Sequence, residues 1–383
     1  MREYSDAIIV GAGASGLLCG GLLASSGLGV LILEKNSRVG KKLLATGNGR
    51  CNFTNRHLSE KQYYGEETWL KDALDGFGPE KIIHRFEEIG LYHREKDGYV
   101  YPYTNQSATV VGVLEDLCRA NGAQIVLDCK ATSVRKTDGG FLVRTPEGEI
   151  RCRYVILATG GKASKELGGD GSGYILAKSL GHSLKSVFPG LTGLVCGGEF
   201  WKRTAGTRVQ GRFSLLIDHR ITEGECGEIQ ITKDGVSGIP VFQLCRVAAR
   251  ALASGRTVEG VIDFVPSMSE EELARWIAAF GIKSLVQKKW CDFFERRAEA
   301  AKQLKAFRFP VEATFGMERA QVTAGGIATD EVNPKTMESL VKPGLFLLGE
   351  LLDVDGRCGG YNLHFAWTSA LRAAGEMAKK DRR

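Results

Sequence analysis

The sequence lacks any cysteine pattern that would build a metal centre. Its ten cysteines include no CxxC pair and no cysteine–histidine cluster at ligand spacing, which are the usual signatures of zinc and iron–sulfur sites. We therefore expect no metal. A secretory signal is not recognisable either, because the apolar segment near the N-terminus continues directly into Glu34 and Lys35. Scattered cysteines without such a signal predict reduced thiols and a cytoplasmic protein.

A strong excess of one charge is also missing. The sequence has 51 lysines and arginines against 45 acidic residues, a net charge of +6, which scattered surface side chains explain without a dedicated polyanion-binding face. With 383 residues, of which 25% are charged and 43% hydrophobic, the chain has the composition of a globular protein of two or three domains. We expect a small-molecule substrate rather than a nucleic-acid partner, and the oligomeric state is left open.

Charged residues are absent from Ala7 to Leu33. That stretch is long enough for a membrane-spanning helix, which needs about 20 apolar residues. Seven glycines interrupt it, however, and each costs a helix interior about 1 kcal/mol relative to alanine. The segment instead predicts a strand over 7–10, a helix over 14–26 and a second strand over 30–33. We therefore expect a βαβ unit and no membrane span.

The glycines of this unit follow the dinucleotide-binding pattern. Gly11, Gly13 and Gly16 stand in GxGxxG register at the turn from the first strand to the helix. The first permits the tight turn, the second lets the backbone approach a diphosphate, and the third allows close packing of helix on strand. Glu34 follows the second strand, where a carboxylate accepts hydrogen bonds from both ribose hydroxyls and repels a 2′-phosphate. The unit therefore predicts FAD or NAD rather than NADP.

A basic, glycine-rich loop follows, from Asn36 to Asn55, with no helical or strand period. A loop of this length with such polar residues is expected to bind a ligand. Further along, short strands over 124–126, 131–135, 140–145 and 149–151 precede a strand that ends in Ala158-Thr159-Gly160-Gly161. This second glycine turn is expected to pass over the nucleotide.

The middle of the chain has a different pattern. Residues 191–239 contain short β-prone runs, and 240–305 are helical and charged, with Trp276, Trp290, Phe293 and Phe294 expected to form a small core. From residue 324 the glycine-rich pattern returns, with a strand over 346–348 and a last helix from about Asn362. The positive end of that helix dipole points at whatever lies at the glycine turn, which in a flavoenzyme would be the N1/C2=O edge of the flavin ring.

Several segments together resemble one family. The motifs GKKLLATGNGRCNFTN, LATGG, GDGSGY, TAGG and GELLDVDGRCGGYN are similar to those of the HI0933/YhiN-type flavoproteins, which include the BaiN-like and aminoacetone-oxidase-like proteins. The resemblance implies an α/β fold: a glutathione-reductase-like Rossmann FAD domain with an inserted β-barrel-like domain that carries a helical subdomain. The FAD domain would comprise 1–190 and 321–383, the barrel 191–239 and 306–320, and the helical subdomain 240–305.

The resemblance also implies which residues bind FAD. They lie in the two glycine turns, in the loop after Glu34 and before the last helix: Gly11, Gly13, Ala14, Ser15, Gly16, Glu34, Lys35, Lys42, Gly47, Asn48, Arg50, Cys51, Asn52, Val134, Thr159, Gly160, Gly349, Glu350, Asp355, Gly360 and Asn362. One departure is His364, which stands where relatives commonly carry glutamine.

The chemistry expected is hydride exchange between flavin N5 and a small organic substrate, with flavin supplying the reactivity. The first hypothesis is NAD(P)H-linked reduction of a conjugated carbonyl or alkene, as in BaiN-like proteins. Oxidation of an aminoacetone-type amine with oxygen is an alternative, and an RNA-binding or RNA-modifying flavoprotein is an alternative of another class. The catalytic residues stay unknown, with Cys51, His364 and Cys358 as weak candidates.

No second dinucleotide fold is recognisable for NAD(P)H. The other dense glycine run, Gly168 to Gly173, lacks the register because Tyr174 occupies the position of the third glycine. NAD(P)H is therefore expected as a transient electron donor that shares one face of the flavin with substrate, in a ping-pong reaction.

Overall fold

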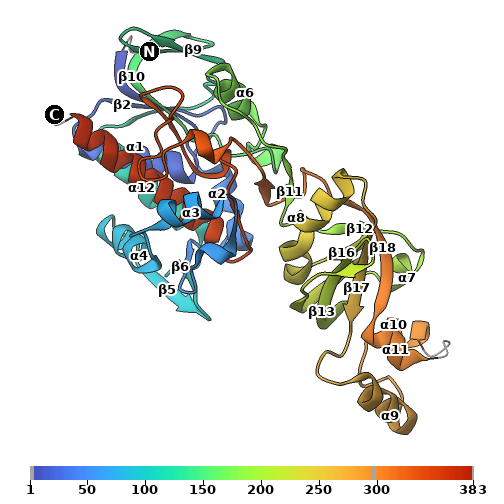
Figure 1. Ribbon diagram of the computed structural model, residues 1–383. Helices are drawn as coiled ribbons and strands as arrows, with labels where there is room; N and C mark the ends of the chain where they lie inside the picture. Colours follow the sequence, from blue (N-terminus) through green and yellow to red (C-terminus); the bar gives the residue numbers. More distant parts are fainter. Residues whose placement is uncertain (1–3, 295–298, 382–383) are drawn as a thin grey trace. The chain divides into compact units, whose positions relative to one another are not determined.

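The structure is a computed structural model that describes residues 4–294 and 299–381. The chain forms two compact units. The first contains the residues up to Val187 and those from Val322 onward, and the second contains Phe188–Gln321 (Figure 1). The chain therefore leaves the first unit once, after Val187, and returns to it once, at Val322.

A seven-stranded sheet forms the centre of the first unit. Its strands run in the order β7-β2-β1-β10-β9-β8, and β20 pairs with the second half of β10. Five strands are parallel, whereas β8 and β9 form an antiparallel meander with β10. The strands are β1 (Tyr4–Val10), β2 (Val30–Leu33), β7 (Gln124–Val126), β8 (Ser133–Thr137), β9 (Gly140–Thr145), β10 (Gly148–Leu157) and β20 (Leu345–Leu347). This Rossmann-type sheet confirms the expected fold class.

Strand β10 joins the meander to the parallel sheet. Its residues alternate between exposed and buried as far as Arg153, and all of them are buried from Tyr154 to Leu157. Alternation fits a strand with one face in solvent, and continuous burial fits a parallel strand covered on both faces. The sequence pattern suggested two strands here because the two environments produce different periodicities.

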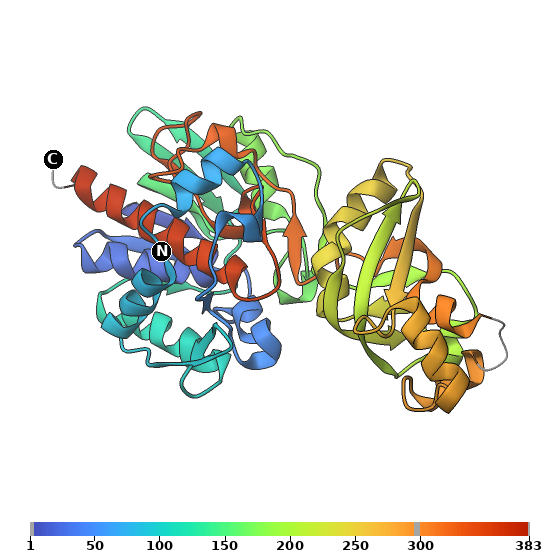
Figure 2. The same cartoon turned by 60° about the horizontal axis from the view of Figure 1, so that its bottom comes forward.

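Helices cover the sheet. α1 (Ala14–Ser25) packs against α12 (Tyr361–Asp381) and α5 (Ser107–Ala120), and Figures 1 and 2 show α12 lying beside α1. The long C-terminal helix thus completes a layer that begins with the first helix of the chain. Within the described ranges, no helix is both long and apolar enough to cross a membrane.

Shorter elements surround this core. The loop expected over 36–55 contains a short helix, α2 (Lys41–Ala45), which begins after Gly40 in the left-handed conformation (φ 63°). Five residues are too few to show a helical period, so the sequence could not reveal it. The other elements of the unit are β3 (Thr54–Asn55), β4 (Tyr63–Tyr64), α3 (Glu67–Leu74), α4 (Pro79–Glu88), β5 (His93–Lys96), β6 (Tyr99–Pro102), α6 (Ser172–Ser179), β19 (Val322–Ala324) and β21 (Asp355–Gly356), with 3₁₀ turns at Thr46–Gly49, Glu60–Gln62, Lys165–Leu167, Thr329–Glu331 and Gly349–Leu351.

The second unit is built on a closed six-stranded antiparallel barrel. Its strands follow one another in the order β13-β15-β16-β12-β18-β17, and β17 pairs with β13 to close the ring. The strands are β12 (Leu194–Cys196), β13 (Arg208–Ile217), β15 (Glu225–Thr232), β16 (Gly235–Ser237), β17 (Val258–Asp263) and β18 (Phe307–Thr314), with β11 (Phe188–Gly190) before them and β14 (Arg220–Ile221) paired to β13. Closure leaves no free strand edge within the ring.

The segment 240–305 differs from the helical subdomain that the sequence predicted. α8 (Ile239–Ala253) packs on the barrel strands, and β17, inside the same segment, is one of those strands. The β-branched residues of β17 form only a short run between charged stretches, which concealed it. Only α9 (Glu270–Phe280), α10 (Lys288–Phe294) and α11 (Ala300–Lys305) remain as helices beyond the barrel wall. Residues 295–298, which the prediction also covered, lie outside the described residues.

Candidate cofactor and active site

The three glycines of the first turn have different surroundings. Gly11 has φ +108°, and a Cβ there would stand 2.5 Å from the carbonyl oxygen of Ala158, while a Cβ on Gly16 would overlap the carbonyl oxygen of Gly11. A Cβ on Gly13 would meet nothing within 4 Å. No described side chain caps the start of α1. The first and third glycines are thus required by packing, whereas the second faces open space beside uncapped helix N–H groups, as a diphosphate site needs.

Glu34 lies at the end of β2 and is only 7% exposed. Its Oε2 accepts a hydrogen bond from the N–H of Ala12 (2.8 Å), and its Oε1 accepts from the N–H and side-chain amide of Asn36 (2.9 and 2.6 Å). These contacts fix the carboxylate beside the glycine turn. Because each carboxylate oxygen has two acceptor positions, the group retains capacity for ribose hydroxyls.

Lys35 is held by an acid. Its Nζ lies 2.5 Å from Oδ1 of Asp170, which also accepts from the N–H of Ser172 at the start of α6. Burial alone would raise the pKa of the Asp170 carboxyl, but the hydrogen bonds from Lys35 and Ser172 and the lysine charge together hold it well below its ordinary value. The glycine run around Asp170 therefore lies at the start of α6 and anchors Lys35.

The loop over 47–52 contains unusual backbone conformations. Asn48 and Cys51 have φ values of 55° and 59°, which non-glycine residues rarely adopt. Within the described residues, Oδ1 of Asn52 is buried without a hydrogen-bond partner. It lies 2.9 Å from the position of a Cβ on Gly360. An orphaned buried acceptor next to an obligatory glycine fits a site that a polar ligand completes.

The turn before α12 is held by Asn362. Its side-chain oxygen accepts from the N–H of Gly356 and its amide donates to the carbonyl of Gly356, both at 2.8 Å. Asn362 therefore shapes the turn in which Gly360 lies, and Asp355 is buried at its base.

The remaining expected contacts lie in the same unit. Lys42 forms an ion pair with Glu350. Gly349, which precedes Glu350, lies against Ser15 in the first turn of α1. Thr159 and Gly160 follow β10 after one intervening residue, Ala158, and the Cβ position of Gly11 is 3.2 Å from Cα of Thr159. The Val134 side chain is buried in the core, and the Arg50 guanidinium lies 5.6 Å from the ring of Tyr101. Of the sequence-predicted residues, Gly11, Glu34 and Gly349 lie just after the parallel strands β1, β2 and β20.

Of the three weak catalytic candidates, Cys51 and His364 are buried, whereas Cys358 is partly exposed. Burial raises the pKa of the Cys51 thiol to about 12 and also raises the pKa of the Cys358 thiol. Burial lowers the pKa of His364 from 6.5 to about 4, against a smaller opposing effect of the Phe77 carbonyl. Since that carbonyl can only accept, Nε2 of His364 donates to it (2.8 Å) and Nδ1 accepts from the Thr54 hydroxyl (2.7 Å). His364 is thus a neutral packed residue.

One cluster that sequence reasoning missed has the composition of a catalytic triad. Nδ1 of His182 lies 3.0 Å from Glu331, and Nε2 lies 2.8 Å from Oγ of Ser339. However, Ser339 is buried, and its hydroxyl already accepts from the N–H groups of Val341 and Lys342. A serine oxygen with both acceptor positions used is a poor nucleophile, so this cluster is a structural clip.

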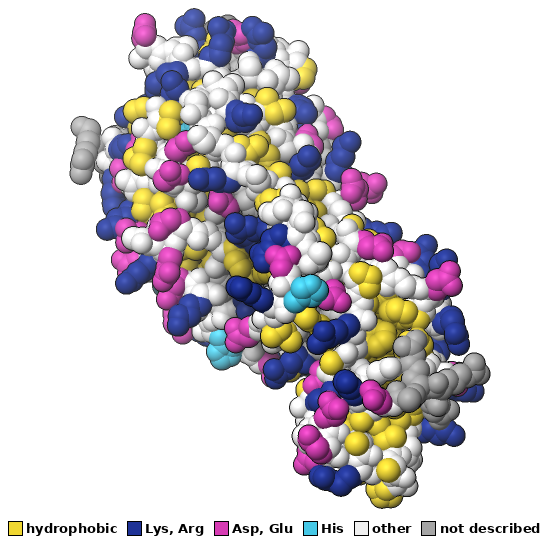
Figure 3. All heavy atoms as spheres, turned by 45° about the vertical axis from the view of Figure 1, so that its right-hand side comes forward, with side chains coloured by type: hydrophobic (Ala, Val, Ile, Leu, Met, Phe, Trp, Pro, Cys, Tyr) yellow, Lys and Arg dark blue, Asp and Glu magenta, His cyan; other side chains and the backbone are white. Residues whose placement is uncertain are grey.

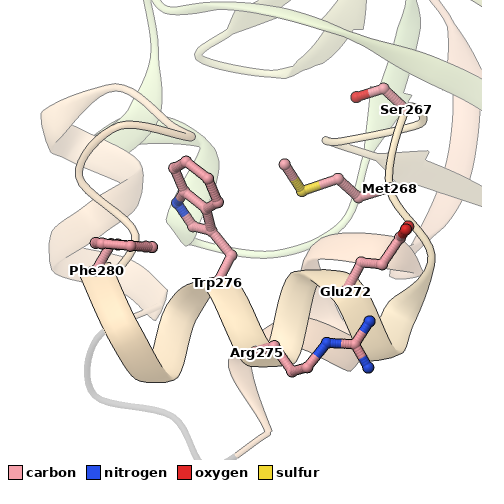
Figure 4. Close-up of a pocket in the computed structure, with 6 residues that line it drawn as sticks. All are labelled: Ser267, Met268, Glu272, Arg275, Trp276 and Phe280. Atoms are coloured by element: carbon pink, nitrogen blue, oxygen red, sulfur yellow. The ribbon is translucent and has the colours of Figure 1, made fainter.

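The second unit contains an open pocket of about 360 Å³, formed by α9 and the segment before it. Figure 4 shows Trp276 and Met268 pointing toward one another, with Phe280 at the end of the helix. The rings of Trp276 and Phe280 lie 4.9 Å apart and are 37% and 72% exposed. Trp290 and Phe294 are buried, as expected of core residues, but Trp276 is not. The other residues that line the pocket are Ser267, Glu272 and Arg275.

Solved structures show the same architecture. The 3-ketosteroid-Δ4-(5α)-dehydrogenase of Rhodococcus jostii RHA1 superimposes with a TM-score of 0.54 at 15% identity, over 98% of this chain and 97% of that one. At that identity the likeness concerns the fold alone. The parallel sheet, the glycine turn and the barrel insertion define a Rossmann-type domain with an inserted barrel, and together with the family match and the reductase relative described next they make the protein an FAD-dependent oxidoreductase.

The chain belongs to the HI0933-like family, because the model of the HI0933-like protein Rossmann domain matches residues 5–376. The resemblance seen in the motifs is thereby confirmed. A 3-dehydro-bile acid Δ(4,6)-reductase of Clostridium scindens is 36% identical over 97% of this chain and 98% of its own length. A ribosomal RNA dihydrouridine synthase of Haemophilus influenzae is 28% identical over 99% of this chain and all of its own length.

Proposed function

We propose that the protein reduces a carbon–carbon double bond conjugated with a carbonyl group in a small, largely apolar ring compound, with NAD(P)H as electron donor. The observation that carries this proposal is the 36% identity, over nearly the whole of both chains, to a reductase named for the Δ4,6 bonds of a 3-oxo bile acid. The name of the second relative describes the same kind of bond, since dihydrouridine is uridine with its carbonyl-conjugated ring double bond reduced. The reaction class is therefore common to both.

FAD would supply hydride from N5 to the substrate carbon β to the carbonyl. The residues present fit this cofactor. The uncapped N–H groups at the start of α1 would bind the diphosphate, beside the open space at Gly13. Glu34 would accept hydrogen bonds from the adenosine ribose, and the unpartnered oxygen of Asn52 would accept one from a polar group of the cofactor. In the cofactor-bound protein, His364 and Cys51 would stay buried and uncharged and would contribute to packing only.

The test is an anaerobic reaction of FAD-loaded protein with NADH or NADPH, followed by a 3-oxo-4-ene steroid or a 3-oxo-4,6-diene bile acid. We expect the flavin absorbance to bleach with nicotinamide and to return with the enone, whose mass increases by two hydrogens. Ping-pong kinetics are expected, because no second dinucleotide turn is present in the sequence. Flavin that is reduced but not reoxidised by any enone, and that reacts instead with oxygen after an aminoacetone-type amine, would contradict the proposal.

Reduction of uridine in RNA is the second candidate, which the name of the Haemophilus relative favours. The surface gives it less support. Figure 3 shows lysine and arginine side chains mixed with aspartate and glutamate on the face it displays, rather than gathered in one basic patch. The exposed pair of Trp276 and Phe280 is the feature best suited to stack a base. RNA affinity with a steep salt dependence, lost in Trp276→Ala, would favour this candidate.

A further inference from the structure

Segments far apart in the sequence meet at the carboxylate of Glu350. Its Oε1 accepts from Nζ of Lys42 (2.9 Å) and from the N–H of Thr323 (2.8 Å), and its Oε2 accepts from Lys42 at 2.7 Å. Lys42 belongs to α2, whereas Thr323 is the middle residue of β19. The ion pair is partly shielded, with 28% and 18% of the two side chains exposed. The carboxylate thus links helix α2 to strand β19.

Thr323 extends this network to the second glycine turn. The residue is fully buried, and its Oγ1 accepts from the N–H groups of Lys162 and Ala163 at 2.8 and 2.9 Å. A Cβ on Gly161 would overlap that hydroxyl and stand 2.9 Å from Oε1 of Glu350. Glycine at 161 is therefore needed so that the turn can approach both residues. Nothing in this arrangement is required for the barrel itself, which has its own core.

The network lies beside the expected diphosphate site. A Cβ on Gly349, the neighbour of Glu350, would be 3.2 Å from Oγ of Ser15 in the first turn of α1. Lys42 has three N–H donors, and its two contacts in the network both go to the one carboxylate. A diphosphate at the start of α1 would add negative charge close to this cation and restrain it.

The network also lies where the chain returns from the insertion. The first unit resumes at Val322, so Thr323 is its second residue after the return. Gly325, two residues later, has φ +87°, and a Cβ there would overlap the carbonyl oxygen of Ser186, just before the chain leaves at Val187. A restraint on Thr323 therefore acts on the part of the first unit that holds both ends of the insertion.

We propose that Thr323 is a positioning residue for the segment Val322–Gly325, where the chain returns to the first unit. Through Lys42 and Glu350, binding of the cofactor makes this segment more rigid. The proposal rests on the FAD site described above. Bound diphosphate fixes Lys42, the fixed ammonium holds the Glu350 carboxylate in place, and the carboxylate keeps the N–H of Thr323 in its hydrogen bond. Without the cofactor the same chain of contacts opens more often.

Amide hydrogen exchange of the full-length protein tests this link, measured by mass spectrometry on peptides covering 318–328, with and without FAD. In the wild type we expect FAD to slow exchange at Thr323 by about tenfold or more, because exchange follows the opening of the hydrogen bond. Lys42→Met should reduce that slowing to less than about threefold. Glu350→Gln retains an oxygen for the Thr323 N–H but loses the ion pair, so it should behave like Lys42→Met.

Matched controls separate the link from simple loss of structure. Lys41→Met removes a neighbouring charge on α2 for which the described residues show no bond to Glu350, and it should respond to FAD as the wild type does. Thr323→Ser retains both the backbone N–H and the hydroxyl that accepts from Lys162 and Ala163, so it should also respond normally. Thermal melting of each variant checks that it is folded, and flavin absorbance checks that it is loaded.

Two failures can be told apart. If the wild type binds no flavin, the proposed cofactor is wrong and the link falls with it. If flavin binds but exchange at Thr323 is unchanged, or if Lys41→Met and Lys42→Met respond alike, the cofactor stands and the link through Lys42 and Glu350 is wrong.

Discussion

The carbonyl oxygen of Gly11 occupies the space that a side chain on Gly16 would need. The two residues face one another across the first turn of α1, so the strand can only continue into the helix if position 16 has no Cβ. Gly13, between them in the sequence, has open space in place of a neighbour. The same motif thus combines two positions that packing restricts to glycine with one that the surrounding protein leaves unrestricted.

Substitution of these glycines should therefore separate stability from cofactor binding. Gly13→Ala should melt close to the wild-type temperature, since its φ of −88° suits alanine and no atom is displaced. Its FAD affinity should nevertheless fall by tenfold or more, about 1.4 kcal/mol, because the methyl group meets the diphosphate. Gly16→Ala should lower the melting temperature of the cofactor-free protein. Equal FAD affinity in Gly13→Ala and wild type would place the diphosphate elsewhere.

Glu34→Ala should weaken FAD binding by about 1.5–3 kcal/mol, the range for hydrogen bonds to a charged group. Part of the loss would come from the turn itself, because the carboxylate also holds the N–H of Ala12. Glu34→Gln, which retains one acceptor oxygen, should lose less. Fluorescence quenching of FAD during titration measures the affinity of the wild type and of both variants. Unchanged binding in Glu34→Ala would contradict the ribose assignment.

His364 should make stability depend on pH. Its pKa is lowered on folding from 6.5 to about 4, so the unfolded chain takes up a proton at a pH where the folded one does not. The free energy of unfolding should therefore fall as pH decreases from 6.5 to 4, by about 3 kcal/mol from this residue. Urea unfolding at each pH measures the loss, which should be smaller in His364→Gln.

The control for that experiment is His84→Gln, a residue whose side chain is 74% exposed. This variant should show the full wild-type pH dependence. His182, whose pKa burial also lowers, is present in every variant and contributes equally to each. A slope that is the same in His364→Gln and wild type would show that His364 titrates normally.

The thiols should differ sharply in reactivity. Cys51 is fully buried and burial raises its pKa to about 12, so almost no thiolate is present at neutral pH. Cys226 is exposed in β15. Brief treatment of the native protein with iodoacetamide at pH 7.5 should label Cys226 first, as peptide mass spectrometry would show. Early labelling of Cys51 would contradict this expectation and would support a role for Cys51 as a flavin-facing nucleophile.

The sequence revealed the parts of the fold that local patterns encode. The run around Gly11 predicted a strand, a helix and a second strand, because glycine placement and apolar periodicity act over a few residues. The motif after Glu350 pointed to a turn before the last helix for the same reason. Strand β17 and helix α2 were missed, because both are short and are stabilised by contacts with segments far away in the chain.

The site divides in the same way. The sequence could place Gly11, Gly13 and Glu34 beside the first turn, because the motif imposes that backbone geometry. The pairing of Lys42 with Glu350 could not, because the two residues are separated by 308 positions and no local pattern marks their approach. Likewise, nothing in the residues around His364 shows that Thr54 and Phe77 would fix its tautomer.

The interrupted course of the first unit has a consequence for the order in which a newly made chain folds. All six barrel strands lie within Phe188–Gln321, so the barrel is complete in sequence before β19 has been synthesised. The Rossmann-type sheet, in contrast, waits for β20 to pair with β10, and α1 waits for α12. During synthesis the barrel can therefore fold while the first unit still exposes the edge of β10 and one side of α1. A nascent chain at that stage depends on protection of these two surfaces from aggregation.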